Sequence, residues 1–207
     1  MTGGPEMLAL RDGVCVPVRE IRPGDAAALQ RLIGRSSDRS VELRFFGPLK
    51  RLSDDQARRF AEVDGRDRFA LVALDPENPE DIVGVVRYER EGETDAAEYA
   101  AMIEDRFQGR GLGIGLTRHL IEAARARGIR RLHALVMREN YGMLHLLRSL
   151  DLPERKRWEG SAEHFEIDLA TGADGSQFVP SEDSQASATM KEPGTFPYRA
   201  PSLHASS

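Results

Sequence analysis

Residues 108–115 read QGRGLGIG and lie between a short apolar run and a segment with helical periodicity. Glycine lets a backbone approach a ligand closely and adopt positive φ angles. The N-terminus of a helix that follows such a loop offers unpaired N–H groups and a partial positive charge. The stretch therefore predicts a loop that holds an anionic group, most naturally a phosphate.

The spacing of these glycines separates three kinds of phosphate-binding loop. The pattern Gly-x-Gly-x-x-Gly fails from Gly109, because Ile114 stands where the third glycine belongs, and from Gly111, where Leu116 takes that place. The loop of nucleoside-triphosphate-binding proteins also fails, since no Gly-Lys-Ser/Thr follows. The pattern that fits is Gln-x-x-Gly-x-Gly, which begins at Gln108.

The residues around the loop show alternating strand-like and helix-like periodicity. The valines of residues 14–18 alternate with other residues, and Ser53 with Gln56 matches a capping box at a helix start. Turn-forming residues 75–79 separate two apolar runs that we expect to pair as antiparallel strands. The predicted strands are 14–18, 69–74, 82–86, 98–103, 132–137 and a pair within 156–169, and the predicted helices are near 28–33, 53–63, 116–124 and 140–150. This order predicts a mixed α/β (α+β) domain with a central sheet.

Length and composition predict one full domain with appendages. The chain has 207 residues, of which 40% are hydrophobic and 30% charged, so it has enough apolar material for a core under a charged surface. We expect residues 1–12 to form a flexible arm and residues 13–169 to form the folded domain. From Ala170 onward Ser, Thr, Pro, Gly and Ala dominate, so residues 170–207 are predicted to be a disordered tail.

Composition also limits the cellular compartments and the kinds of partner that we expect. The single cysteine, Cys15, excludes an internal disulfide framework and favours a reducing cytosol, so we expect a cytoplasmic protein. Neither a membrane-spanning apolar run nor a secretory leader is visible, and no membrane partner is expected. A net charge of -5 argues against nucleic acid as a partner, because its binding needs a basic surface. The five histidines contain no His-x-x-x-His pair, so no metal site is expected.

The loop, the strand-like residues 97–103 before it, the strand after its helix and Asn140 at the next helix start together resemble the GNAT superfamily of acyl-CoA-dependent N-acetyltransferases. The resemblance covers roughly residues 14–169. It implies a mixed, mostly antiparallel central sheet flanked by helices, with acetyl-CoA as co-substrate and no metal. The residues that it assigns to the cofactor are Ala101, Met102 and Ile103 for the pantetheine arm, Gln108, Gly109, Arg110, Gly111, Leu112, Gly113 and Ile114 for the diphosphate loop, and Asn140 further along. On the residues alone, the glycines could instead make only a flexible connection or a tight helix start.

Transfer of an acetyl group from a thioester to an amine needs a neutral amine. A lysine ε-amine has an ordinary pKa of about 10.4 and is mostly protonated at neutral pH, so a nearby carboxylate helps as general base. Glu98, within the AEYAA of residues 97–101, resembles the glutamate base of the protein-lysine acetyltransferase branch. The alternative is an exposed glutamate near a strand end, as expected for Glu89 and Glu91.

The general acid is left open. Many GNAT enzymes protonate the departing thiolate with a tyrosine on the helix that the asparagine opens, but here that position is Leu147. Tyr141 and His145 lie nearby in sequence and are expected to be packing or surface residues. A thiol has an ordinary pKa of about 8.5, so the thiolate can leave without a dedicated acid. A backbone N–H near Met102 is expected to polarise the thioester carbonyl.

Residues 43–50, LRFFGPLK, resemble the Arg-Phe-Phe segment of bacterial Pat-type protein-lysine acetyltransferases, and residues 64–73 continue the similarity. Phe45 and Phe46 could equally be aromatic core anchors. The resemblance favours a protein-lysine acetyltransferase, with an acyl-CoA synthetase or another metabolic enzyme as target. The alternatives are acetylation of small amines and a non-catalytic acyl-CoA-binding sensor. The missing tyrosine allows a sensor, whereas Glu98 argues against it.

Overall fold

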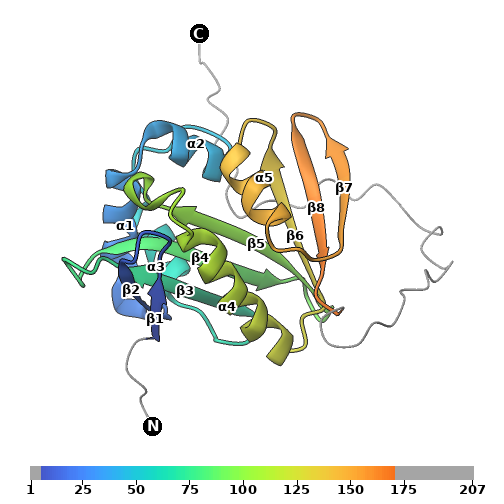
Figure 1. Cartoon of the computed structure of the whole chain (residues 1–207), viewed down its shortest axis with the longest axis horizontal. Coiled ribbons are helices and arrows are strands. Elements are labelled where there is room, and N and C mark those ends of the chain that lie inside the picture. The colour runs from blue at the N-terminus through green and yellow to red at the C-terminus, as the bar shows by residue number, and fades with distance from the viewer. Residues whose placement is uncertain (1–5, 171–207) are drawn as a thin grey trace, which may run out of the picture.

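The computed structural model describes residues 6–170, which form an eight-stranded sheet with helices on both faces (Figure 1). The strands are β1 (Glu6–Ala9), β2 (Cys15–Glu20), β3 (Arg68–Leu74), β4 (Ile82–Arg90), β5 (Ala96–Ile103), β6 (Arg131–Met137), β7 (Glu154–Glu159) and β8 (Ala162–Asp168). The helices are α1 (Ala26–Arg35), α2 (Asp38–Phe45), α3 (Asp54–Ala61), α4 (Leu112–Ala126) and α5 (Tyr141–Arg148), with short 3₁₀ turns η1 (Pro23–Asp25) and η2 (Asp105–Phe107). The strand order is β1-β2-β3-β4-β5-β6-β8-β7. The predicted fold, a mixed and mostly antiparallel sheet flanked by helices, is confirmed.

The pairing of β5 with β6 differs from every other pairing in this sheet. The other neighbouring strands are antiparallel, whereas β5 and β6 are parallel. Their ladder joins Ala96–Glu98 to Arg131–His133, although β5 continues to Ile103 and β6 to Met137. The two strands therefore separate beyond Glu98. Figure 1 shows α2 and α5 at the same end of the molecule, above β5 and β6.

Two hydrophobic cores lie on the two faces of the sheet. One core packs α4 and α5 against the sheet and contains Leu116 and Phe165. The other packs α1, α2 and α3 against the opposite face and contains Leu32 and Val72. Burial of apolar surface contributes about 25 cal/mol per Å², and β3, β4 and β5 have buried residues in both cores. The central strands therefore form the most firmly held part of the fold.

Local sequence explains several of the element boundaries. Ser53 Oγ accepts a hydrogen bond from the Gln56 N–H (3.2 Å), and Gln56 Oε1 accepts one from the Ser53 N–H (2.8 Å), which confirms the predicted capping box. The predicted antiparallel pair around residues 75–79 is β3 with β4. Helix α2 is not predicted by periodicity, because Val41 and Phe45 are its only buried residues.

The prediction of a flexible arm over residues 1–12 is wrong for residues 6–12. Strand β1 pairs antiparallel with β2, and Leu10 is 5% exposed. Leu8 packs against α4 at Gly115, where an added Cβ would stand 2.7 Å from a Leu8 methyl carbon. These contacts join segments that are far apart in the chain, so the composition of the arm does not reveal them.

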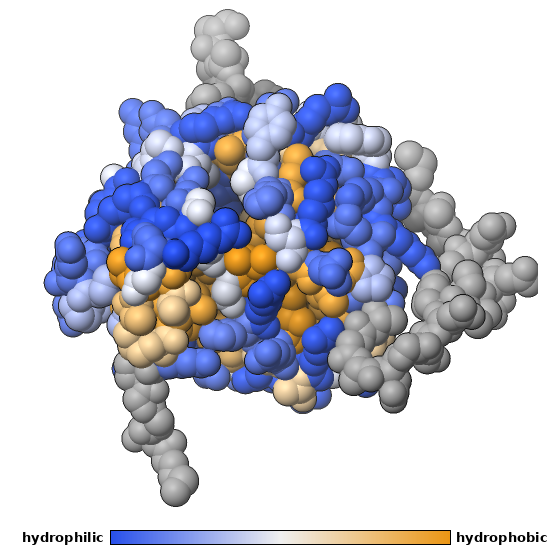
Figure 2. All heavy atoms as spheres, in the orientation of Figure 1, coloured by the Kyte–Doolittle hydropathy of each residue, from blue (hydrophilic) through white to orange (hydrophobic). Residues whose placement is uncertain are grey.

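Residues 171–207, nearly all of the predicted tail, lie outside the described residues. In the part of the chain that the structure describes, no helix is both long enough and apolar enough to cross a bilayer. Figure 2 shows polar and charged residues over most of one face, with hydrophobic residues visible near its middle.

Candidate functional site

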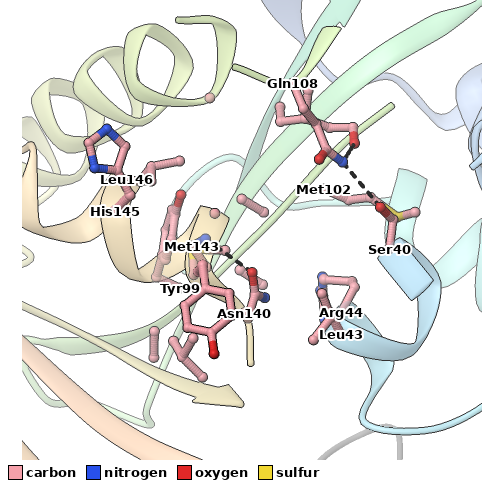
Figure 3. Close-up of a pocket in the computed structure, with 18 of the residues that line it drawn as sticks. Ser40, Leu43, Arg44, Tyr99, Met102, Gln108, Asn140, Met143, His145 and Leu146 are labelled. Carbon is pink, nitrogen blue, oxygen red and sulfur yellow. Dashed lines mark hydrogen bonds between the residues drawn. The ribbon is translucent and has the colours of Figure 1, made fainter. Parts of the chain in front are cut away.

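A cleft of about 1070 Å³ opens where β5 and β6 separate. This volume is at the upper end of the range typical of small-molecule and cofactor sites. Figure 3 shows the two walls: Ser40, Leu43 and Arg44 come from α2, and Met143, His145 and Leu146 come from α5 on the opposite side. The inner wall is β5, and the glycine-rich loop lies at the edge of the cleft.

Strand β5 presents a free edge to the cleft. Ala101, Met102 and Ile103, the residues predicted to contact the pantetheine arm, all line it. They lie beyond the ladder that joins β5 to β6, so this edge faces the cleft instead of a neighbouring strand. Backbone N–H and C=O groups along such an edge can pair with an extended chain that carries amides.

The glycine-rich loop turns sharply between β5 and α4. Gly109 and Gly111 adopt φ angles of 70° and 94°, a region that side chains with a Cβ rarely occupy. Gly111 is the N-cap of α4 and no side chain caps this helix, so its first N–H groups are available to an anion. Gly113 lies under α5, where an added Cβ would stand 2.8 Å from a Leu146 methyl carbon.

Gln108 uses its side chain to hold the loop in place. Its amide nitrogen donates to the Ile103 carbonyl oxygen (2.9 Å) and to Ser40 Oγ (3.1 Å), as Figure 3 shows for Ser40. Ser40 Oγ in turn donates to Asp105 Oδ1 (2.8 Å). The predicted cofactor residue Gln108 lines the cleft and also ties the loop to helix α2.

Two of the predicted loop residues direct their side chains away from the cleft. Arg110 Nε donates to Asp12 Oδ2 (2.6 Å), and its guanidinium lies 4.8 Å from the centre of the Phe107 ring. Leu112 is fully buried in the core below α4. Neither of these two residues lines the cleft, whereas Ile114 does.

Asn140 both caps a helix and lines the cleft. Its Oδ1 accepts a hydrogen bond from the Met143 N–H (3.0 Å) at the start of α5, which is drawn in Figure 3. Among the described residues, its amide nitrogen has no hydrogen-bond partner, and that group is available to a ligand.

Glu98 lines the cleft at the last position of the β5–β6 ladder. It lies directly opposite Glu89 in the pairing of β5 with β4. Burial is the main influence and raises the pKa of Glu98; the nearby Glu89 and Glu91 raise it as well, whereas Arg44 and Arg87 lower it. A carboxylate whose pKa is raised toward the working pH is suited to accept a proton as general base.

Position 147 cannot supply a general acid, because Leu147 has no acidic proton and is 2% exposed in the core. Tyr141 and His145 are exposed at the cleft wall. Tyr99 is buried, with its hydroxyl oxygen 2.7 Å from Thr117 Oγ1. Because Thr117 donates its one proton to the carbonyl of Gly113 (2.7 Å), Tyr99 must donate to Thr117. Tyr99 therefore supports the first turn of α4.

Four arginines that the sequence analysis does not predict line the cleft: Arg11, Arg39, Arg44 and Arg87. The Arg11 side chain passes beside Gly111. The backbone N–H of Arg11 donates to the Arg110 carbonyl oxygen (2.9 Å). The signal for Arg44 was its place in the Arg-Phe-Phe segment. Arg87 directly follows the apolar residues 82–86 of β4 and is itself buried, which is unusual for a charged residue.

Of the four histidines that the structure describes, His145 alone lines the cleft. His133 and His164 stack with their ring centres 5.7 Å apart on β6 and β8. Among residues 6–170, no group of three or more His, Cys, Asp or Glu side chains is arranged to hold a metal ion.

Both the sequence and the structure resemble known proteins. A family model described as Acetyltransferase (GNAT) family matches residues 39–151. An acetyltransferase of Pseudomonas aeruginosa is 34% identical over 139 residues, which cover 67% of this chain and 75% of that protein. The crystal structure of the GNAT domain of S. lividans PAT is 32% identical with a TM-score of 0.73, over 79% of this chain and 96% of that one. A cAMP-binding acyltransferase from Mycobacterium smegmatis is 25% identical with a TM-score of 0.58, over 80% of this chain and 47% of that one.

Proposed function

Because this chain belongs to the GNAT family of acetyltransferases, we propose that it moves the acetyl group of acetyl-CoA to the ε-amine of a lysine in a protein. The target that we propose is an acyl-CoA synthetase or another metabolic enzyme of the cytoplasm. Two features support a protein acceptor: the Arg-Phe-Phe segment on the acceptor side of the cleft, and the similarity to the GNAT domain of S. lividans PAT.

The observation that carries the proposal is the position of Glu98. It is partly buried at the point where β5 leaves β6, next to the free edge formed by Ala101, Met102 and Ile103. A co-substrate whose pantetheine arm lies along that edge and whose diphosphate lies on the loop before α4 brings its thioester close to this carboxylate. Asn140 is placed to contact the same arm from α5.

Glu98 accepts a proton from the lysine ammonium, directly or through one water. The lone pair of the resulting amine forms a C–N bond to the thioester carbon, and the electron pair of the C–S bond leaves with the thiolate. Backbone N–H groups near Met102 stabilise the negative charge that develops on the carbonyl oxygen. The second proton lost by the nitrogen returns to the thiolate through solvent, so the products are acetyl-lysine and a free thiol.

The test is acetylation of a bacterial lysate depleted of acetyl-lysine, read by mass spectrometry after incubation with acetyl-CoA and the purified chain. Glu98→Gln retains the shape of the side chain and removes the base. We expect about a hundredfold or greater loss of the rate, as for other general bases. The matched control is Glu89→Gln, which changes the glutamate directly opposite on β4 and is expected to cost far less.

Discrete acetylated lysines with the original chain and a strong loss in Glu98→Gln would support both the acceptor and the base. Acetylation of small amines without any acetylated protein would instead favour a small-molecule acetyltransferase. Binding of acetyl-CoA without transfer to any amine would contradict the proposal, and would indicate a sensor.

A further inference from the structure

Two arginines lie on the acceptor side of the cleft close to Glu98. Arg44 comes from α2 and Arg87 from β4, and both line the cleft. On β4, Arg87 stands directly opposite Ala100 and Glu89 directly opposite Glu98, so Arg87 and Glu98 share one face of the sheet. These residues come from three separate segments that meet only in the folded protein.

Neither arginine has an ion-pair partner among the described residues. Arg44 lies over the Phe45 ring, with its guanidinium carbon 5.0 Å from the ring centre, and no carboxylate of residues 6–170 lies within 4.0 Å of it. Arg87 packs over Phe60 at 4.7 Å and donates from Nη1 to the Phe60 carbonyl (3.3 Å). Its Nη2 is buried with no hydrogen-bond partner.

Burying the Arg44 and Arg87 guanidinium groups without a paired anion costs free energy of desolvation. Arg87 is 8% exposed, and burial together with the charge of Arg44 lowers the pKa of Arg87 to about 10. Burial also lowers the pKa of Arg44, while the charge of Glu98 acts to raise it. Buried cations normally have a carboxylate partner. The other two arginines near Arg87 are already paired with Glu89, Arg59 at 3.5 Å and Arg68 at 3.9 Å.

We infer that Arg44 and Arg87 form a subsite for a carboxylate on the acceptor, so that preferred acceptors carry a carboxylate close to the amine that is acetylated. Arg44 is the more exposed of the two and makes the direct contact, while Arg87 adds positive potential from the sheet below. The inference rests on the proposed amine acetylation, because it concerns the acceptor of that reaction. The carboxylate can belong to an Asp or Glu side chain beside the target lysine or to a free amino acid.

The experiment compares acceptors that differ only in this charge. One pair is ε-aminocaproate and ε-aminocaproamide. Their carboxylate or amide group is too remote from the amine to change its pKa greatly. The other pair is a blocked Gly-Asp-Lys-Gly peptide and its Asn counterpart. Release of the CoA thiol gives kcat/KM for each, and the ratio within a pair cancels effects common to both acceptors. A preference within the aminocaproate pair would identify a free amino acid as the source of the carboxylate. A preference within the peptide pair would identify an Asp or Glu side chain beside the target lysine.

We expect the acidic member of at least one pair to be preferred about tenfold or more, as is usual for a charge-assisted hydrogen bond. Arg44→Gln should bring this ratio close to one, and Arg44→Lys should retain part of it, because lysine has the charge without the planar fork. Arg87→Lys tests the second cation without removing its charge. The control is Arg51→Gln, which removes an exposed arginine outside the cleft that is already paired with Asp54 (3.1 Å) and should leave the ratio unchanged.

A ratio near one for both pairs in the original chain would overturn the subsite. Acetylation of the members that lack the carboxylate would leave the proposed function intact. If Arg44 acts only by keeping Glu98 ionised, Arg44→Gln will slow both members of a pair by the same factor, and the unchanged ratio would also overturn it. Acetylation of lysate proteins but of none of the four amines would overturn the subsite alone, and failure with the lysate as well would remove the proposed function too.

Discussion

The two sides of the cleft are built in different ways. The side that we assign to the cofactor is lined mainly by one stretch, residues 101–114, which presents the free edge of β5 and the glycines before α4. Asn140 adds to it from the start of α5. The acceptor side brings together side chains from α2, β4 and β5, with Arg44, Arg87 and Glu98 as its charged members. The comparison teaches that a backbone site can be encoded locally, whereas a side-chain site needs the whole fold to assemble it.

A buried carboxylate ties the cofactor side to α1 and to the turn after β3, and removing its charge is expected to have the largest effect on stability. Glu104 is 4% exposed; it accepts from Arg35 Nε of α1 at 3.0 Å and pairs with Arg106, which also reaches Asp75 at 2.5 Å. Glu104→Gln removes the anion that these two partly exposed arginines share, so we expect a loss of about 1.5–3 kcal/mol in unfolding free energy.

Urea denaturation of the Glu104→Gln variant measures this loss. The control is Glu42→Gln, which removes an exposed pair with Arg39 and should cost less than about 1 kcal/mol. Equal effects of the two substitutions would show that the buried carboxylate adds no more stability than an exposed ion pair.

The next effect concerns the backbone of the cofactor side. Gly111 has a φ of 94°, and an added Cβ would stand 3.3 Å from Arg11 Cγ. Gly111→Ala is therefore expected to destabilise the protein by about 1–2 kcal/mol and to weaken acetyl-CoA binding measured by calorimetry. Gly109→Ala is the matched control, because its φ is also positive but no atom lies within 4 Å of the added Cβ. A weaker effect at Gly111 than at Gly109 would contradict this account.

A smaller effect is expected at the hydrogen bonds that tie the cofactor loop to α2. Ser40 Oγ accepts from Gln108 Nε2 (3.1 Å) and donates to Asp105 Oδ1 (2.8 Å). Ser40→Ala removes both, with a cost of about 1 kcal/mol, and should raise the KM for acetyl-CoA although Ser40 belongs to the acceptor side. An unchanged KM in steady-state kinetics would mean that the loop holds its geometry without α2.

The smallest expected effect is a shift of the pH profile. Glu98 must be ionised to act as base, and its raised pKa means that kcat/KM falls as pH decreases through that pKa. Arg44 lowers this pKa, as does Arg87, while Glu89 and Glu91 raise it. Arg44→Gln should therefore move the acid limb to higher pH, and Arg44→Lys should move it less. Profiles measured with ε-aminocaproamide, the acceptor without a carboxylate, check this. An acid limb that moves to lower pH would contradict the assignment of that limb to Glu98.

Sequence patterns predict those features that depend on neighbours in the chain. The capping box at Ser53 and Gln56 forms as expected, because its donors and acceptors are three residues apart. The antiparallel pair β3–β4 likewise follows from two apolar runs and a turn. Helix α2 and strand β1 were not predictable in this way, since each depends on contacts with distant segments, such as Leu8 against Gly115.

The candidate site divides along the same line. The glycine spacing after Gln108, the strand before it and Asn140 were sufficient to predict the family by resemblance. They also predicted a loop suited to an anion, because steric freedom and helix N–H groups are local properties. Only the tertiary structure decided that Arg110 turns to Asp12, that Gln108 binds Ser40, and that Arg44 and Arg87 meet beside Glu98. Burial and charge at these side chains depend on segments that folding brings together, and no stretch of sequence contains that information alone.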